Sequence, residues 1–149
     1  MTTATEASPS SQAAPIVTGI SHVGLTVTDI VASERWYTEV LGLVRAFVEP
    51  HATGEGHAVV LTRPGTGLFL GLDHHHDAEG EAFSARRTGL DHLALQVSAR
   101  GDLDEWISHL DAVGVEHEQL FETAHPTPHA LVLVRDPDGI PIELFWHGG

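Results

Sequence analysis

Three side chains of types that bind divalent metals occupy comparable places in this sequence. His22 and His92 lie 70 residues apart (92 − 22 = 70) in two similar stretches, and Glu143 lies near the C-terminus. In each predicted strand the apolar residues alternate onto one face, and the histidine or the glutamate falls on the other. If those faces curve toward one another, two imidazoles and one carboxylate could hold a single ion and leave about three octahedral positions open. This ligand set suits non-haem Fe(II), and it could also hold Mn(II), Ni(II), Co(II) or Zn(II).

The composition narrows the chemistry further. The chain of 149 residues contains no cysteine and no lysine, and its formal net charge is −14. Disulfides, thiolate nucleophiles and cysteine-ligated zinc are therefore excluded, and so are Schiff-base lysines and lysine-containing phosphate loops. The negative charge argues against nucleic acid and anionic membranes as partners. No apolar run approaches the roughly 20 residues that span a bilayer.

Two similar sets of elements must position these residues. The first predicted strand, about residues 17–27, is followed by a helix that Asp29 caps and Gly42 ends, and then by three further strands. The same order returns after residue 88, with Gly114 ending the second helix. The predicted strands after the first helix are 44–49, 57–62 and 67–72, and those of the second set are 89–98, 115–122, 129–135 and 140–146.

The spacing of the two sets indicates an internal duplication. The helix-ending glycines differ by 72 (114 − 42 = 72), and the same offset aligns Gly71 with Glu143. We therefore predict an α+β fold of two tandem strand–helix–three-strand modules. The predicted division is a flexible tail at 1–16, a first module at 17–72, a connector at 73–88 and a second module at 89–147. The tail lacks the basic start and apolar stretch of a signal peptide, so a cytoplasmic protein is expected.

On these residues the chain resembles the vicinal oxygen chelate superfamily. The likeness covers roughly residues 17–147 and includes the final run Asp-Pro-Asp-Gly-Ile-Pro-Ile-Glu-Leu-Phe at 136–145. Its members include glyoxalase I, extradiol catechol dioxygenases, methylmalonyl-CoA epimerase, fosfomycin-resistance transferases and bleomycin-binding proteins. The resemblance implies a cupped mixed β-sheet, or half-barrel, with helices outside and a metal held by His22, His92 and Glu143. It also implies a homodimer, in which the two cups pair either within one chain or between chains.

One position departs from the pattern of the glyoxalase-like and epimerase-like members. These take a fourth ligand, Glu or Gln, from the last strand of the first module, where this sequence has Gly71. Asp73, two residues further on, is the remaining alternative. A set of three ligands resembles the extradiol dioxygenases and the fosfomycin-resistance enzymes. The latter also bind an anionic phosphonate, for which a chain with seven basic side chains offers little.

The resemblance thus implies a small metalloenzyme that binds a compact oxygenated metabolite through two adjacent oxygens. The ligand count favours an extradiol-type Fe(II) dioxygenase. One alternative is a glyoxalase-like lyase or isomerase, with water or Asp73 as the fourth ligand. The other is a non-catalytic, antibiotic-binding protein of the bleomycin-resistance type, which the presence of all three metal-binding residues disfavours.

Further residues are candidates for the rest of the site. General acid–base chemistry needs a titratable group near the substrate, and His76, His125 and His129 lie in or beside predicted loops that could reach the mouth of the cavity. Each could instead be an ordinary surface histidine. Phe69 and Phe145 share the strand faces of Gly71 and Glu143, so they are the predicted apolar walls of a substrate pocket.

Overall fold

The structure is a computed structural model that describes residues 14–148, with two helices and eight strands. Of the expected flexible tail, residues 1–13 lie outside the described range. The first module comprises β1 (Val23–Thr26), α1 (Ile30–Glu39), β2 (Val44–Pro50), β3 (Gly56–Arg63) and β4 (Leu68–His75). The second module comprises β5 (Leu93–Gln96), α2 (Asp102–Val113), β6 (Phe121–Thr123), β7 (His129–Arg135) and β8 (Pro141–His147).

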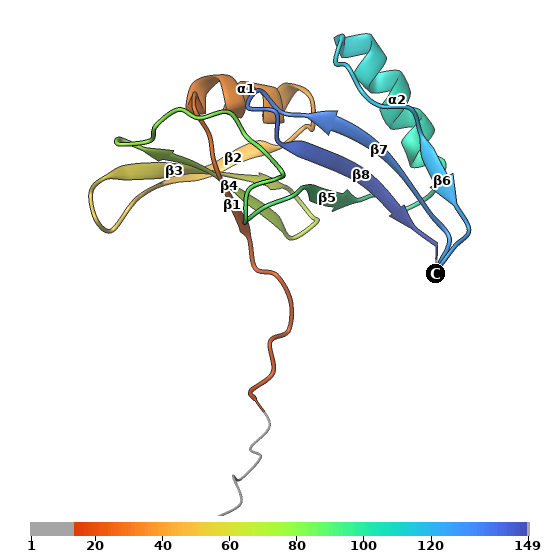
Figure 1. The fold of residues 1–149 in the computed structure, drawn as a ribbon, viewed down its shortest axis with the longest axis horizontal. Helices are drawn as coiled ribbons and strands as arrows, with labels where there is room; N and C mark the ends of the chain where they lie inside the picture. Colours follow the sequence, from red (N-terminus) through yellow and green to blue (C-terminus); the bar gives the residue numbers. More distant parts are fainter. Residues whose placement is uncertain (1–13, 149) are drawn as a thin grey trace, which may run out of the picture.

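The strands form two four-stranded sheets that lie side by side, with both helices above them (Figure 1). The strand orders are β1-β4-β3-β2 and β5-β8-β7-β6, so the two modules repeat one topology. In each sheet the first strand pairs with the last in parallel and the other pairings are antiparallel. Neither sheet closes on itself. The prediction of two strand–helix–three-strand modules in an α+β fold is confirmed.

The helix boundaries follow from the local sequence. Asp29 caps α1, and its carboxylate accepts hydrogen bonds from the backbone amides of Val31 and Ala32 at 3.0 Å each. Gly42 and Gly114, after the two helices, have φ angles of +65° and +70°, a region that side chains disfavour. The predicted helix signals at these positions are confirmed. Neither helix in residues 14–148 combines the length and apolar character that crossing a membrane requires.

Several strands differ from the predicted bounds: β5 covers Leu93–Gln96 rather than 89–98, and β6 covers Phe121–Thr123 rather than 115–122. For β1 and β4, backbone pairing explains the difference. β1 begins at Val23 rather than at residue 17, because its parallel partner β4 begins only at Leu68 and Val23 pairs with Leu70. β4 continues to His75, three residues beyond the predicted end, because His75 still pairs with Gly56 across the sheet. Polar side chains do not end a strand whose backbone groups have partners.

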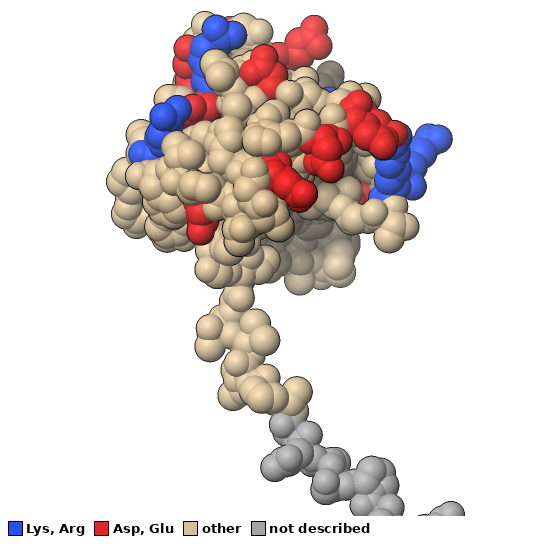
Figure 2. All heavy atoms as spheres, turned by 90° about the vertical axis from the view of Figure 1, so that its left-hand side faces the viewer, with Lys and Arg blue, Asp and Glu red and all other residues tan. Residues whose placement is uncertain are grey.

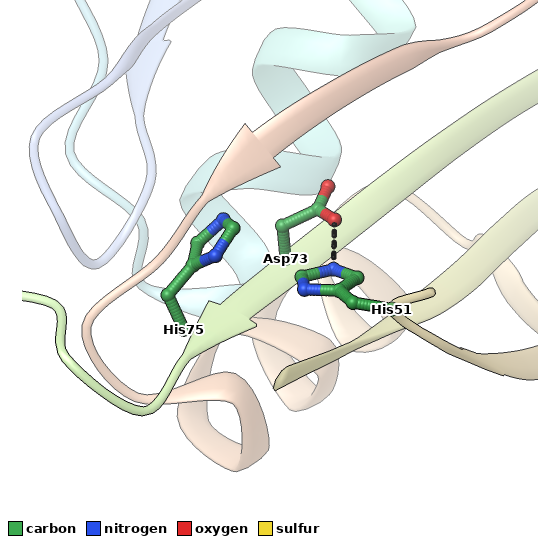
Figure 3. Close-up of side chains that lie close together, drawn as sticks. All are labelled: His51, Asp73 and His75. Carbon is green, nitrogen blue, oxygen red and sulfur yellow. Dashed lines mark hydrogen bonds and ion pairs between the residues drawn. The ribbon is translucent and has the colours of Figure 1, made fainter. Parts of the chain in front are cut away.

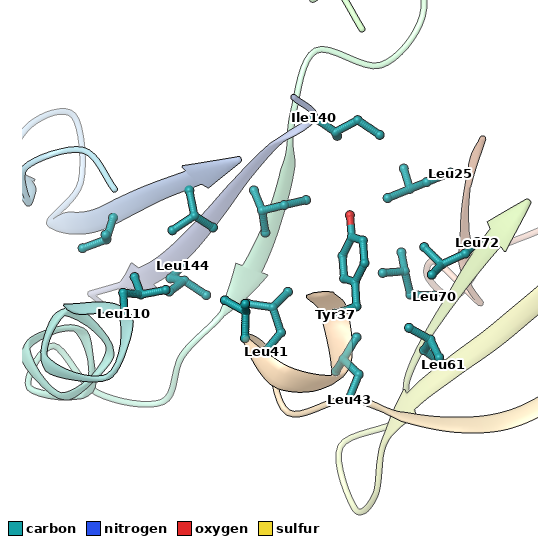
Figure 4. Packing of buried hydrophobic residues seen from close by; sticks show 14 of the residues in the cluster. Leu25, Tyr37, Leu41, Leu43, Leu61, Leu70, Leu72, Leu110, Ile140 and Leu144 are labelled. Carbon is teal, nitrogen blue, oxygen red and sulfur yellow. The ribbon is translucent and has the colours of Figure 1, made fainter. Parts of the chain in front are cut away.

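A single core joins the two modules. Tyr37 of α1 is fully buried, with side chains of the first sheet along one side of its ring and Ile140 of the second module beyond its hydroxyl (Figure 4). Its hydroxyl donates to Oδ2 of buried Asp136 at 3.0 Å, and Oδ1 of Asp136 accepts from the Ile140 amide at 2.8 Å. Because these contacts cross between the modules, they hold the two sheets in one arrangement.

The side of each sheet away from its helix is called its open face here. Strand alternation assigns successive odd-numbered residues of β4 and β8 to these faces. On β4 the open face carries Phe69, Gly71, Asp73 and His75, and on β8 it carries Pro141, Glu143, Phe145 and His147.

Candidate functional site

His92 and Glu143 face each other on the open face of the second sheet. The parallel register pairs Ala94 with Glu143, which brings the residue before β5 alongside β8. His92 Nε2 lies 3.6 Å from Glu143 Oε2, and the two side chains are 44% and 16% exposed. Two ligand atoms that share one ion at bond lengths of about 2.1 Å lie roughly 3–4 Å apart. The separation therefore fits two ligands of a common metal, and a half-buried carboxylate needs such a cation or a donor.

Asp91 orients the imidazole of His92. Its Oδ1 lies 2.7 Å from His92 Nδ1, so a proton on Nδ1 would be donated to this carboxylate. The lone pair of Nε2 would then point toward Glu143, as in the carboxylate–histidine pairs that support metal sites. The hydrogen bond to Asp91 is also the largest cause that raises the pKa of His92, desolvation opposes it, and the charge of Glu143 adds to it.

His22 does not join this pair within one chain. It lies exposed just before β1, and its Nδ1 is 3.5 Å from the hydroxyl of Ser21. Within residues 14–148, the set His22, His92 and Glu143 does not bring three ligand atoms within 4.8 Å of one another. A single chain thus brings together two of the three predicted ligands. That all three bind one ion stays a prediction.

The carboxylate of Asp73 lies close to Gly71, the predicted position of a fourth ligand. A Cβ atom at Gly71 would lie 3.3 Å from Asp73 Oδ2, and one at Gly24 would lie 2.7 Å from the same oxygen. The carboxylate of Asp73 therefore extends back across these two glycines. Its other oxygen, Oδ1, accepts a hydrogen bond of 2.9 Å from His51 Nε2.

His51, Asp73 and His75 form a cluster that the sequence interpretation did not bring together (Figure 3). Their ligand atoms all lie within 4.8 Å of one another, and the rings of His51 and His75 are 4.7 Å apart between centroids. The sequence predicts Asp73 only as an alternative fourth ligand, and it places His75 in the connector. The signal that could have found them is the alternation of Phe69, Gly71, Asp73 and His75, which continues the strand period into the polar run.

The three candidate acid–base histidines lie in different surroundings. His129 stacks on Phe145, with ring centroids 5.5 Å apart and an angle of 11°, so it lies on the open face of the second sheet. His125 is exposed in the loop before β7. His76 is exposed after β4, with its ring 5.7 Å from that of His74. A catalytic role for any of them stays a prediction, as does the role of Phe145 and of Phe69 as pocket walls.

Two tandem modules of one topology, with a histidine–carboxylate pair on an open sheet face, define an α+β protein of the vicinal oxygen chelate architecture. The chain belongs to the Glyoxalase/Bleomycin resistance protein/Dioxygenase superfamily, whose family model matches residues 19–144. The resemblance drawn from the sequence is therefore confirmed at the level of the family.

Individual relatives agree with this assignment. A glyoxylase/bleomycin resistance protein/dioxygenase domain from Frankia sp. EAN1pec is 30% identical, with a TM-score of 0.77 over 89% of this chain and 94% of that one. The uncharacterized protein YaeR of Escherichia coli (strain K12) is 25% identical over 85% of this chain and 94% of its own length. The fosfomycin resistance protein FosX of Listeria monocytogenes, solved with Mn(II) and sulfate, is 17% identical with a TM-score of 0.62. It covers 89% of this chain and 95% of its own, and at that identity it supports the fold alone.

Proposed function

We propose that this chain is a divalent-metal-dependent enzyme that acts on a compact metabolite through two adjacent oxygen atoms. The observation that carries the proposal is the 3.6 Å separation of His92 Nε2 and Glu143 Oε2, with Asp91 behind the imidazole. Glu143 is the predicted anionic ligand and His92 the predicted neutral one. The bound ion, Fe(II) by preference and otherwise Mn(II), Ni(II), Co(II) or Zn(II), would act as a Lewis acid toward the two substrate oxygens.

The third ligand in this proposal is His22 of a second copy of the chain. Support comes from the exposure of His22 and from apolar side chains on the open face of the first sheet, where Phe47 and Phe69 are 50% and 40% exposed. Exposed aromatic side chains on one sheet face favour burial against a partner. A homodimer that lays the first sheet of one copy over the second sheet of the other would cover them and bring the three ligands together.

Extradiol-type cleavage of a catechol ring, with both atoms of dioxygen entering the product, is the reaction proposed first. Three protein ligands leave room for a bidentate substrate and for a further small molecule, because Gly71 offers no side chain. Phe145 and the stacked ring of His129 would form an apolar wall beside Glu143. A glyoxalase-like lyase or isomerase is the second candidate, because the carboxylate of Asp73 reaches toward the place of the missing ligand.

Anaerobic loading with Fe(II), followed by a panel of catechols in air, tests the first candidate. Yellow ring-cleavage products with matching oxygen uptake are expected for the wild type. Glu143→Gln should give neither. A parallel screen with hemithioacetals tests the lyase. Turnover of a hemithioacetal without oxygen uptake on any catechol would replace the first candidate by the second.

Mixing two inactive variants tests the exchange between chains. His22→Ala and His92→Ala each remove one ligand, and a mixed dimer of the two would regain one complete site. If half of the dimers re-form as mixed pairs, about a quarter of the wild-type activity should return. Activity that stays absent after mixing, with mixed dimers shown by native mass spectrometry, would contradict the exchange.

A further inference from the structure

The cluster of His51, Asp73 and His75 is a second place in the molecule with the donors of a metal site (Figure 3). We propose that it binds a divalent transition-metal ion of the class that prefers imidazole and carboxylate ligands, such as Zn²⁺, Ni²⁺ or Co²⁺. The cluster lies on the first sheet, whereas His92 and Glu143 lie on the second. All its ligands come from one chain, so the proposal does not depend on the proposed function or on a dimer.

The backbone holds the three ligands at one end of the first sheet. Asp73 and His75 lie two residues apart on β4 and therefore point to the same face. His51 follows β2, and its amide donates to the carbonyl of Gly56 at 3.0 Å, which fixes the chain beside the start of β3. The ligands thus come from two strand ends that the antiparallel pairing of β3 already holds together.

Two glycines make room for these side chains. A Cβ atom at Gly56 would lie 2.9 Å from His51 Nδ1, and it would also meet the carbonyl oxygen of His74 at 1.9 Å. A Cβ atom at Gly24 would lie 2.7 Å from Asp73 Oδ2. Each contact is closer than real Cβ atoms allow, so the imidazole and the carboxylate occupy space that only glycine leaves free.

The distances fit coordination to one ion. His51 Nε2 and Asp73 Oδ1 are 2.9 Å apart, and two ligands at right angles, about 2.1 Å from an ion, are separated by about 3 Å. Binding of a metal at His51 Nε2 would replace its hydrogen bond to Asp73. One ligand nitrogen of His75 lies within 4.8 Å of the other two ligand atoms, so its ring would move toward them when an ion binds.

The surroundings favour a cation. The side chains of His51 and Asp73 are only 20% and 24% exposed, which limits competition from water. Carboxylates are spread over this end of the molecule while arginines lie at its edges (Figure 2), and the whole chain carries a formal charge of −14. Such a surface raises the local concentration of cations.

A nearby group of histidines provides the matched control. The ring of His74 lies near those of both His57 and His76. Its centroid is 5.6 Å from that of His57 and 5.7 Å from that of His76. His74 lies on β4 between two proposed ligands but on the opposite face of the strand. If metal bound loosely to any histidine-rich stretch, loss of His74 would weaken binding as much as loss of His75. The proposed site predicts that only the loss of His75 weakens it.

Metal binding is measured in the His92→Ala background, which removes the pair on the second sheet. Chelator-treated protein without a histidine tag is titrated with Zn²⁺ by calorimetry, and bound metal is counted by elemental analysis after dialysis. We expect one Zn²⁺ per chain, with affinity reduced at least about tenfold by His51→Ala, by His75→Ala and by the near-isosteric Asp73→Asn. His74→Ala should bind Zn²⁺ as tightly as its parent. Circular dichroism of each metal-free variant shows that it is folded, and Co²⁺ absorption provides a second readout.

The outcomes separate this proposal from the previous one. Equal Zn²⁺ affinity in the cluster variants and their parent, or an equal loss in His74→Ala, would overturn the second site. Failure of the proposed function would instead appear as equal metal content in wild type and His92→Ala, with binding still lost in the cluster variants.

Discussion

The open faces of the two sheets follow one plan but carry their carboxylates at different positions. With the offset of 72 residues, Asp73 of β4 corresponds to Phe145 of β8, and Gly71 corresponds to Glu143. In the second sheet the carboxylate faces His92, beside the start of β5. In the first sheet it lies two residues later and is bonded to His51, after the end of β2.

The neighbouring strand accounts for part of this difference. His75 pairs with Gly56 across the first sheet, and the equivalent His147 pairs with His129 across the second. Because Gly56 has no side chain, the ring of His51 can lie over it. In the second sheet the ring of His129 itself fills that space and stacks on Phe145. The change from glycine to histidine at this position, together with Asp73 in place of Phe145, therefore accompanies a polar cluster in one sheet and an aromatic stack in the other.

Gly56→Ala should have the largest effect on stability, because it places a side chain where the ring of His51 lies. The new methyl group would meet the His74 carbonyl at 1.9 Å and the His51 ring at 2.9 Å. We expect a loss of about 3 kcal/mol in the free energy of unfolding, at the upper end for overpacked sites. Urea unfolding followed by fluorescence measures it. Gly101→Ala is the control, because its Cβ would meet nothing within 4 Å. Equal stability of the two variants would show that the first sheet does not need a glycine there.

Tyr37→Phe tests whether the two sheets belong to one cooperative unit. It removes the hydroxyl that donates to buried Asp136 and should cost about 1.5–3 kcal/mol, as expected for a bond to a charged group. Thr28→Val, which removes a more exposed bond to Asp138 between the same modules, should cost less. Two separate unfolding transitions in either variant would mean that the modules unfold independently, and the sheets should then be compared as separate domains.

The loss of stability caused by Tyr37→Phe should depend on pH. Burial raises the pKa of Asp136, and the hydrogen bond from Tyr37 lowers it in part. A carboxyl whose pKa is raised by folding makes the protein less stable as pH rises from its unfolded pKa through its folded one. Without the Tyr37 hydroxyl, the loss of stability with rising pH should be larger. The difference in the free energy of unfolding between wild type and Tyr37→Phe should therefore increase from acid to neutral pH. A gap that narrows would contradict the role assigned to the hydroxyl.

Much of the fold could be predicted because it depends on local signals. The helix cap at Asp29, the glycines that end both helices and the repeat offset are all readable along the chain. Alternation also placed His92 and Glu143 on open faces, and the structure brings these two together. The position of His22 could not be predicted in the same way, because it depends on how whole modules pair.

The cluster on the first sheet was missed for a different physical reason. The run from Asp73 to His76 is polar, which predicts a connector, yet backbone pairing extends β4 to His75. His51 joins it from a separate strand end, and nothing along the chain relates residues 51 and 73. The space for its ring depends on Gly56, whose importance is apparent only from the neighbouring carbonyl and imidazole.

Gly71→Glu would place a carboxylate at the same position in both sheets. The Cβ would lie 3.3 Å from Asp73 Oδ2, so that carboxylate must move by a few tenths of an ångström. If the predicted ligands share one ion, a fourth ligand should tighten Mn²⁺ binding about tenfold, which corresponds to about 1.4 kcal/mol, and should reduce any catechol cleavage. Titration by electron paramagnetic resonance in a His51→Ala background measures it. Gly71→Leu should not tighten binding, and the proposed metal position would be wrong if both variants behaved alike.

Asp91→Asn should have the smallest effect, a change in the pKa of His92. It tests which carboxylate holds the imidazole of the second sheet. His92 lies between two carboxylates, Asp91 at 2.7 Å from Nδ1 and Glu143 at 3.6 Å from Nε2. The hydrogen bond to Asp91 is the largest of the causes that raise the pKa of His92, and the charge of Asp91 also contributes, so Asp91→Asn should lower that pKa more than Glu143→Gln does. NMR titration of the His92 ring protons in metal-free protein measures both changes, with Asp104→Asn as a distant control. A larger shift in Glu143→Gln would mean that the open-face carboxylate already pairs with the imidazole, as Asp73 does with His51, and the two sheets would then differ only in where their pairs lie.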